Sequence, residues 1–241
     1  MHVSRNDNFP IFSGVMDMSN KNLFWLKKQT YGEAEEHSVI IMDRSGQPLG
    51  KLVPVGPWVL EDIAIISSLV SWRDKFKKMF PTQTSVDLTS TAKFLTNFFI
   101  DNDQAVLFLI YSDAGQLLGH IGVSDLSECS FEVTNLMRGV PGGHADLIYF
   151  SEYSVIDYMF EKFNLESASV EVMSYNWMVR SLHEEIGFKV TESKGLRKLV
   201  DDAGIRHEVV RDVDANVEYT IQKMRLSRED FGDNGNLYDL H

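Results

Sequence analysis

Apolar and polar positions repeat along this chain with two periods, and each period predicts one kind of element. Alternation is typical of a half-buried strand, and apolar residues three or four positions apart are typical of a helix with one buried face. The alternating segments cover residues 38–43, 49–55, 105–111, 116–123, 130–137, 167–173, 187–192 and 217–226. The segments with helical spacing cover residues 60–73, 84–99, 145–163 and a short stretch after Asn176. From residue 49 onward this order of strands and helices is typical of an α/β domain.

Two of these segments carry a definite prediction about which side chains share a face. In the strand near 130–137, alternation places one row on one face, Phe131, Val133, Asn135 and Met137, and the other row opposite, Glu132, Thr134 and Leu136. In the helix that begins after Thr84, the residues expected to face the core are Leu88, Ala92, Leu95, Phe98 and Phe99.

Composition narrows the class of protein. The chain has 241 residues, of which 44% are hydrophobic, so we expect one large domain or one domain with an N-terminal extension. The net charge of −12 argues against a general nucleic-acid binder, which would carry a basic surface. A single cysteine, Cys129, excludes an internal disulfide, and no apolar run approaches the roughly 20 residues that span a bilayer. We therefore expect a soluble, cytoplasmic protein without contacts to nucleic acid or membrane.

The stretch from Asn176 to Phe188 links two of the expected strands through a short helix. Its sequence is Asn-Trp-Met-Val-Arg-Ser-Leu-His-Glu-Glu-Ile-Gly-Phe. Asn176 is a favourable N-cap, because its side-chain oxygen can accept from a first-turn N–H. Gly187 can adopt the left-handed conformation in which many helices end. The pattern alone predicts strand, helix and strand in that order.

This arrangement resembles the closing motif of the GNAT superfamily of acyl-CoA-dependent N-acyltransferases. The residues that match the family are Asn176, Leu182, Glu184, Gly187 and Phe188, and the departure is His183, where the family usually has a tyrosine. The resemblance implies an α/β (α+β) fold with a mixed, mostly antiparallel central sheet flanked by helices. It covers residues 48–226, which leaves an N-terminal extension at 1–47 and a C-terminal tail at 227–241.

A glycine-rich turn is the candidate for binding the pyrophosphate of acetyl-CoA, which the resemblance implies as co-substrate. Backbone N–H groups at the start of a helix form an anion site. The turn 139–145 precedes the helix at 145–163 and matches the second half of the family's Gln/Arg-x-x-Gly-x-Gly/Ala signature. Val140 stands at the basic position, and Arg138 lies two positions before it. A flexible turn ahead of a packing helix is the alternative. The resemblance implies that acetyl-CoA contacts Leu136, Met137, Arg138, Gly142, Gly143, His144, Ala145, Asn176 and Arg180.

Three side chains are candidates for proton transfer. Glu132 lies within an apolar strand beside the expected cleft, where partial burial would suit it as general base; a solvent-facing side of the sheet explains it equally. His120 is a second candidate, although a satisfied core histidine is the commoner fate. His183 stands where the family has its acid, but an imidazole of ordinary pKa is largely unprotonated at neutral pH. The alternative for His183 is a partly exposed helix residue.

The resemblance implies transfer of an acetyl group to a primary amine by direct attack in a ternary complex. Three details fit the branch that acts on amino sugars or small metabolites: Trp72-Arg73, Gly119-His120-Ile121-Gly122, and Asn135-x-x-Arg138-Gly139. We expect a small amine acceptor, with an amino sugar or sugar nucleotide first. The acidic composition alternatively suits a cationic amine. A non-catalytic acyl-CoA-binding or protein-interaction module and a protein or peptide N-acetyltransferase are the other hypotheses. A homodimer stays open, and no metal-ligand spacing is present, so we expect no metal.

Overall fold

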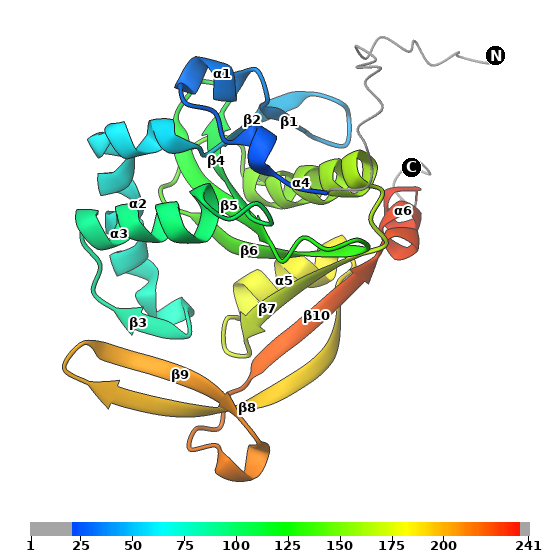
Figure 1. The fold of residues 1–241 in the computed structure, drawn as a ribbon. Helices are drawn as coiled ribbons and strands as arrows, with labels where there is room; N and C mark the ends of the chain where they lie inside the picture. The colour runs from blue at the N-terminus through cyan, green and yellow to red at the C-terminus, as the bar shows by residue number, and fades with distance from the viewer. Residues whose placement is uncertain (1–20, 237–241) are drawn as a thin grey trace.

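Ten strands form one mixed sheet in the computed structural model, which describes residues 21–236 (Figure 1). The strand order is β1-β2-β4-β5-β6-β7-β10-β8-β9-β3, and each neighbouring pair is antiparallel except β6 and β7. In that order the strands are Val39–Met42, Pro48–Pro54, Val106–Ser112, Leu117–Ser124, Ser130–Arg138, Ser167–Met173, Ile221–Ser227, Lys189–Asp201, Gly204–Val210 and Thr82–Thr84. The expected mixed, mostly antiparallel sheet flanked by helices is confirmed.

Helices cover both faces of the sheet (Figure 1). The α-helices are α1 (Tyr31–Glu35), α2 (Ile63–Phe76), α3 (Leu88–Phe94), α4 (Leu147–Phe163), α5 (Trp177–Ile186) and α6 (Arg228–Asn236). The shorter helical segments are η1 (Phe24–Leu26), η2 (Pro57–Glu61), η3 (Lys77–Met79), the π-helical η4 (Leu95–Ile100) and η5 (Asp212–Asp214). Alternate residues of β4 divide the core: Phe108 and Ile110 pack with α4, whereas Leu107 and Leu109 pack with α2 and η4.

Local capping explains where several helices begin and end. The Asp62 side chain accepts from the backbone N–H of Ile65 at the start of α2, and Asp87 forms a capping box with Ser90 at the start of α3. Asn164 and Gly187 end α4 and α5 in the left-handed conformation. The Gly187 stop was predicted from the sequence and is confirmed.

The parallel pair β6 and β7 separates part-way along its length, and we refer to this separation as the β6–β7 split. The two strands pair only from Ser130 to Val133 and from Ser167 to Val170. Beyond these residues β6 pairs only with β5, and β7 pairs only with β10. The remaining backbone edges of the two strands therefore face each other without bonding.

A β-bulge in β6 corrects the predicted division of its side chains between the two faces. Asn135 has a left-handed φ of 50°, and the register with β5 shifts between His120 and Gly122. One additional residue on β6 reverses the alternation from that point. Met137 consequently packs with the α2 and η4 cluster, whereas Val133 packs with α4. The prediction that these two share a face is wrong.

The second predicted helix changes type, which corrects part of its predicted core face. From Leu95 the helix is π-helical, with more residues per turn than an α-helix. Phe99 is fully buried, whereas Phe98 is 38% and Leu88 47% exposed. The inward orientation predicted for Phe98 and Leu88 is therefore wrong. Phe98 lies in the π-helical part, where the phase of a single helical period no longer holds, whereas Leu88 is the first residue of α3 and lies ahead of that change.

The described residues ahead of β2, from 21 to 47, pack on the rest of the molecule. Leu23, Leu26 and Ile41 are fully buried in the same cluster as α4, and β1 pairs along β2. The division into an extension at 1–47, a domain at 48–226 and a tail stays a prediction.

A long hairpin, β8 and β9, extends from the sheet and folds back toward the connection between α2 and α3 (Figure 1). The short strand β3 in that connection pairs with β9, from Thr82 with Arg206 to Thr84 with Gly204. We call this pairing, together with its bonds to His207, the clasp. The pattern of apolar and polar residues predicted a strand over 187–192 and the next one only at 217–226. The hairpin was missed because its polar, solvent-facing residues do not alternate clearly.

Candidate active site

The β6–β7 split is the feature around which the candidate site is built. The unpaired part of β6 contains Leu136 and Met137, two of the residues expected to contact pantetheine. Leu136 packs partly against the α4 cluster, and the Met137 side chain is buried on the opposite face. Free strand edges can bond to an extended ligand in the way that an added strand would. The split can therefore accept the amide-containing arm of acetyl-CoA.

The glycine-rich turn lies between β6 and the N-terminus of α4. Gly142 and Gly143 have φ angles of 141° and 62°, a region that disfavours residues with a Cβ. A Cβ on Gly143 would also lie 2.8 Å from Leu118 Cδ1. The backbone thus requires both glycines for its conformation, whatever the turn binds.

The Arg138 side chain holds the glycine-rich turn in place through hydrogen bonds to its backbone. Its guanidinium donates to the carbonyl oxygens of Gly142, His144 and Ala145, at 3.0 Å from Nη1 to Ala145. The basic residue that is displaced from the family signature therefore shapes the turn. Its expected contact with acetyl-CoA stays a prediction.

Asn176 and Arg180 mark the start of α5. The Asn176 side chain makes no capping hydrogen bond, so the predicted side-chain cap is wrong, although the backbone carbonyl accepts from Arg180 N at 3.0 Å. The side-chain amide of Asn176 therefore makes no capping hydrogen bond to α5. The Arg180 guanidinium forms an ion pair with Glu184 at 2.9 Å. A CoA phosphate would have to share Arg180 with this carboxylate.

Glu132 lies on the side of β6 that faces away from α4. It is half-buried, and burial raises its pKa to about 7, with further contributions from the negative charges of Glu171 and Asp125. The positive charge of Lys223 opposes this shift. A carboxyl group that titrates near neutral pH is suited to act as general base.

His120 is buried on β5 beneath α2. Its Nδ1 lies 2.6 Å from the carbonyl oxygen of Asn135, so Nδ1 carries the proton that it donates, and its ring stacks on Trp72 with 6.2 Å between ring centroids. Burial lowers the His120 pKa to about 4, with Arg73 contributing in the same direction. His120 is therefore neutral near pH 7, and so low a pKa makes it a weaker base than Glu132.

His183 lies in the interior, between α5 and α4. Its Nδ1 is 2.7 Å from Glu152 Oε1, and both side chains are almost completely buried. The Phe188 ring packs edge-on against the imidazole, with 5.6 Å between centroids. The alternative of a partly exposed helix histidine is wrong. Its expected role as general acid stays a prediction.

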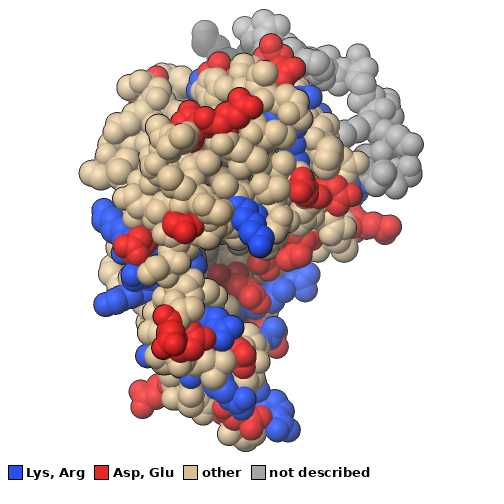
Figure 2. All heavy atoms as spheres, turned by 60° about the vertical axis from the view of Figure 1, so that its left-hand side comes forward, with Lys and Arg blue, Asp and Glu red and all other residues tan. Residues whose placement is uncertain are grey.

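Acidic residues gather on the side of the sheet that carries Glu132. Figure 2 shows acidic side chains in a hollow between the body of the molecule and the β8–β9 hairpin. Glu171 on β7 pairs in register with Lys223 on β10, and Ser169 pairs with Glu132. These polar residues form a surface on which an amine could approach the split from the side opposite α4.

The clasp ties the β8–β9 hairpin to the connection between α2 and α3. His207 Nδ1 donates to the Pro81 carbonyl oxygen at 2.7 Å, and His207 Nε2 accepts from the Tyr219 hydroxyl at 2.7 Å. Nearby, the Tyr175 hydroxyl donates to the Lys78 carbonyl oxygen at 2.7 Å. The connection between α2 and α3 is thereby tied to β9 and to the end of β7.

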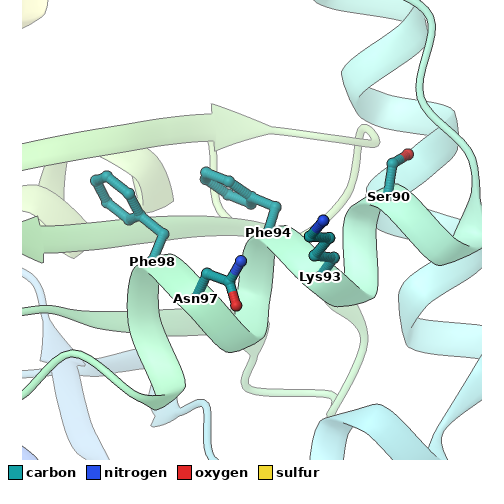
Figure 3. A pocket seen from close by; sticks show the side chains of 5 residues that line it. All are labelled: Ser90, Lys93, Phe94, Asn97 and Phe98. Atoms are coloured by element: carbon teal, nitrogen blue, oxygen red, sulfur yellow. The ribbon is translucent and has the colours of Figure 1, made fainter.

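A separate shallow hollow lies over α3 and η4, lined by Ser90, Lys93, Phe94, Asn97 and Phe98 (Figure 3). The rings of Phe94 and Phe98 point the same way and stack at 5.3 Å. Both touch Phe99, which packs against Gly122 in β5. This hollow contains none of the candidate catalytic residues, so we assign it no part in the chemistry.

Comparison with solved structures gives consistent neighbours. A probable GNAT-family acetyltransferase from Chromobacterium violaceum has a TM-score of 0.60 at 11% identity, covering 80% of this chain and 88% of the other. Apo FdhC, a nucleotide-linked sugar GNAT, has a TM-score of 0.54 at 18% identity over 79% and 93% of the two chains. Spermidine N-acetyltransferase from Vibrio cholerae, in complex with CoA and spermine, has a TM-score of 0.53 at 14% identity over 71% and 92%. No family model matches the sequence, and no curated protein is similar to it in sequence.

This chain has the GNAT fold. The expected family resemblance is confirmed at the level of the fold. Sequence identities of 11%, 18% and 14% do not show which substrate this chain uses. Within the GNAT fold the candidate residues fall into two groups: Glu132 and His120 on the side of the sheet opposite α4, with His120 covered by α2, and His183 on the α4 side.

Two parts of the site were not predicted from the sequence. Glu152 interrupts the apolar stripe of α4 one turn after Ile148 and one turn before Ile156, and a charged residue within such a stripe is a usable signal. The clasp residues His207 and Tyr219 gave no such signal, because the contact depends on a hairpin that was not predicted.

Neither a metal site nor a membrane-spanning helix is found in the part of the chain that the structure describes. Between residues 21 and 236, no group of three or more His, Cys, Asp or Glu side chains is arranged to hold a metal ion. Among the helices described, none combines the length and apolar character that a membrane span requires.

Proposed function

We propose that this protein is an acetyl-CoA-dependent N-acetyltransferase that acetylates the primary amine of a small molecule. The observation that carries the proposal is the β6–β7 split, with unpaired backbone edges on both sides. The glycine-rich turn lies at the start of α4, and Asn176, whose side chain makes no capping bond, lies at the start of α5. A thioester held between the strands would meet an amine arriving from the Glu132 side.

The strand edges of the split and the glycine-rich turn suit acetyl-CoA, the co-substrate that the fold implies. The turn ahead of α4 offers backbone N–H groups at a helix start, which suits a pyrophosphate. The strand edges of the split offer hydrogen-bonding groups for the amides of pantetheine. Leu136, Met137 and Arg138 would supply the β6 edge, and the turn from Gly142 to Ala145 would receive the phosphates.

The reaction then follows as one direct transfer. The amine nitrogen attacks the thioester carbonyl carbon, and Glu132 takes the proton that the nitrogen loses. The C–S bond breaks, the electron pair leaves with sulfur, and His183 gives a proton to the thiolate. The products are the acetylated amine and CoA with a free thiol. A raised pKa allows Glu132 to accept a proton near neutral pH and to release it to water afterwards.

The acceptor that we rank first is an amino sugar or a sugar nucleotide that carries an amine. The structural likeness to FdhC, described as a nucleotide-linked sugar GNAT, supports this ranking. The likeness to a spermidine N-acetyltransferase and the acidic surface around Glu132 support a cationic amine as second choice.

Two other functions are separated by specific observations. A protein or peptide acceptor requires an open groove, and the clasp would restrict such a groove by tying the β8–β9 hairpin to the connection between α2 and α3. A non-catalytic acyl-CoA-binding module is favoured by the histidine at the usual tyrosine position and by the incomplete phosphate signature.

The test is release of free CoA thiol from acetyl-CoA in the presence of single amines. The panel should contain amino sugars, sugar nucleotides carrying an amine, polyamines and short peptides. We expect turnover with one of the small amines and none with peptides. Acetyl-CoA binding without turnover across the panel would favour the non-catalytic module.

A further inference from the structure

Glu152 is a buried carboxylate whose position packing alone does not explain. It lies in the second turn of α4 and is 0% exposed. One oxygen, Oε1, bonds to His183, and among the residues that the structure describes the other, Oε2, has no hydrogen-bond partner. An unsatisfied buried polar atom is costly, and an apolar residue would often serve a purely structural purpose better.

The pair of Glu152 and His183 joins the two helices that border the split. α4 begins at the glycine-rich turn, and α5 begins at Asn176, directly after β7. The imidazole is fixed by Glu152 at Nδ1 and by the ring of Phe188 at its edge. Since Nδ1 is engaged, Nε2 is the ring atom that can exchange a proton with a ligand.

We propose that Glu152 is a positioning residue that accepts Nδ1–H of His183 and balances the charge of its imidazolium, so that Nε2–H is delivered to the sulfur of CoA. This inference rests on the function proposed above. When the C–S bond breaks, the proton moves from Nε2 to the thiolate. His183 becomes neutral, and Nδ1 keeps its proton, which it continues to donate to Glu152. Water returns a proton to Nε2 after the products leave.

The carboxylate also accounts for the departure from the family at position 183. A tyrosine hydroxyl is protonated at neutral pH without assistance, whereas an imidazole must carry a positive charge before Nε2 can donate. The Glu152 carboxylate lies 2.7 Å from the other nitrogen, where it accepts the proton that Nδ1 keeps throughout the transfer. The histidine and Glu152 therefore act as one unit.

The test compares steady-state kinetics of four full-length variants with those of the wild type, using acetyl-CoA and the amine found in the panel. Glu152→Gln keeps the shape of the side chain and removes its charge. His183→Asn keeps a donor near the position of Nδ1 and deletes Nε2. The third protein combines both changes. The matched control is Glu161→Gln, the same change at an exposed position of α4.

We expect Glu152→Gln to lower kcat about 10- to 100-fold, up to the lower end of the roughly 10²- to 10⁴-fold that general acid–base catalysis usually contributes. KM for acetyl-CoA should change less than about 2-fold, because the carboxylate makes no contact with the substrate. His183→Asn should lower kcat at least as far, and the double variant should be no slower than His183→Asn alone. Glu161→Gln should leave both constants unchanged.

A wild-type kcat in Glu152→Gln, or a double variant slowed by the product of the two single effects, would overturn the role of Glu152. A loss confined to KM would do the same, since it would indicate a packing effect on binding. Should Glu152→Gln not fold, His183→Asn decides alone, and full activity of that variant overturns the proposal. A wild-type protein that releases no CoA with any amine would instead overturn the proposed function itself.

Discussion

The carbonyl oxygen of Asn135 accepts a hydrogen bond from His120 Nδ1 at 2.6 Å, across the bulge that joins β5 and β6. The left-handed backbone of Asn135 creates the bulge, and the bond fixes the proton of His120 on Nδ1. Because burial lowers the His120 pKa to about 4, this histidine stays neutral at working pH. Glu132, with a pKa of about 7, is the stronger base on the same side of the sheet.

Replacing Glu132 by glutamine should therefore remove the base. We expect kcat to fall about 10²- to 10⁴-fold, the usual range for general acid–base catalysis. In the wild type, activity should rise with pH through about 7, because only the ionised carboxylate accepts a proton. The pH dependence of kcat/KM, measured from pH 5.5 to 9, should lose this rising limb in the variant.

Glu171→Gln is the matched control. Glu171 is exposed on β7, and its charge contributes to the raised pKa of Glu132. Removing that charge should move the rising limb to lower pH while leaving the maximal rate near wild type. A limb that stays at the same pH in both glutamine variants would exclude Glu132 as its origin.

The same carboxyl group should make stability depend on pH. Its pKa in the folded protein lies above its ordinary value of 4.5, so its contribution to stability is fully present below about 4.5 and is lost as pH rises through about 7. Glu132→Gln should therefore gain stability relative to wild type at pH 8, by about 1–2 kcal/mol after solvent screening. Thermal unfolding at pH 5 and pH 8 measures this. An equal difference in Tm at both values would contradict the assignment of a raised pKa.

Most of the architecture was predictable because the strand and helix segments carry strong periodicity. The segment Asn176 to Phe188 and the turn at Gly142 and Gly143 lie where the sequence pattern placed them. The errors arose where a bulge or a change of helix type alters which face of the element the following side chains occupy. The bulge at Asn135 transfers Met137 to the other face, and the π-helix from Leu95 exposes Phe98. Neither change leaves a sign in hydrophobicity.

The candidate site was predictable only in part, for a related reason. Glu132 and His120 stood out as polar residues in apolar strands, and the structure supplies their pKa shifts. The partner of His183 is 31 positions away on another helix, and such a contact requires the packing of α4 against α5. Spacing in the sequence cannot provide it.

Charge changes at the glycine-rich turn test the phosphate site. Gly143→Glu would strain the backbone and clash with Leu118, so His144→Glu is the better variant, since this side chain is exposed. The added negative charge should weaken acetyl-CoA binding at least about 10-fold by repulsion. Asp146→Asn, which removes an exposed negative charge at the N-cap of α4, should strengthen binding about 2- to 5-fold.

The control for these variants is Ala203→Glu in the exposed turn of the β8–β9 hairpin. It adds the same charge far from the glycine-rich turn along the fold and should leave binding unchanged. Titration calorimetry with acetyl-CoA measures all three affinities. Equal affinities for the two turn variants would show that the pyrophosphate binds elsewhere.

Loosening the clasp should alter acceptor selection. Tyr219→Phe removes the hydroxyl that bonds to His207 Nε2, at a cost of about 0.5–1.5 kcal/mol in the free energy of unfolding. The acceptor surface should become easier to open, so the kcat/KM for bulky amines should rise relative to small ones. Thr191→Val, which removes a hydroxyl bond on β8 outside the clasp, is the control. Unchanged relative kcat/KM values in Tyr219→Phe would show that the clasp does not limit acceptor size.

The central claim is that the β6–β7 split binds acetyl-CoA. Calorimetric titration of the wild-type protein with acetyl-CoA tests it most directly, with Asn176→Leu titrated alongside. We predict a dissociation constant in the micromolar range for the wild type, about −8 kcal/mol in binding free energy, and clearly weaker binding for the variant. Absence of heat with the wild type, or equal affinity for both proteins, would contradict the claim.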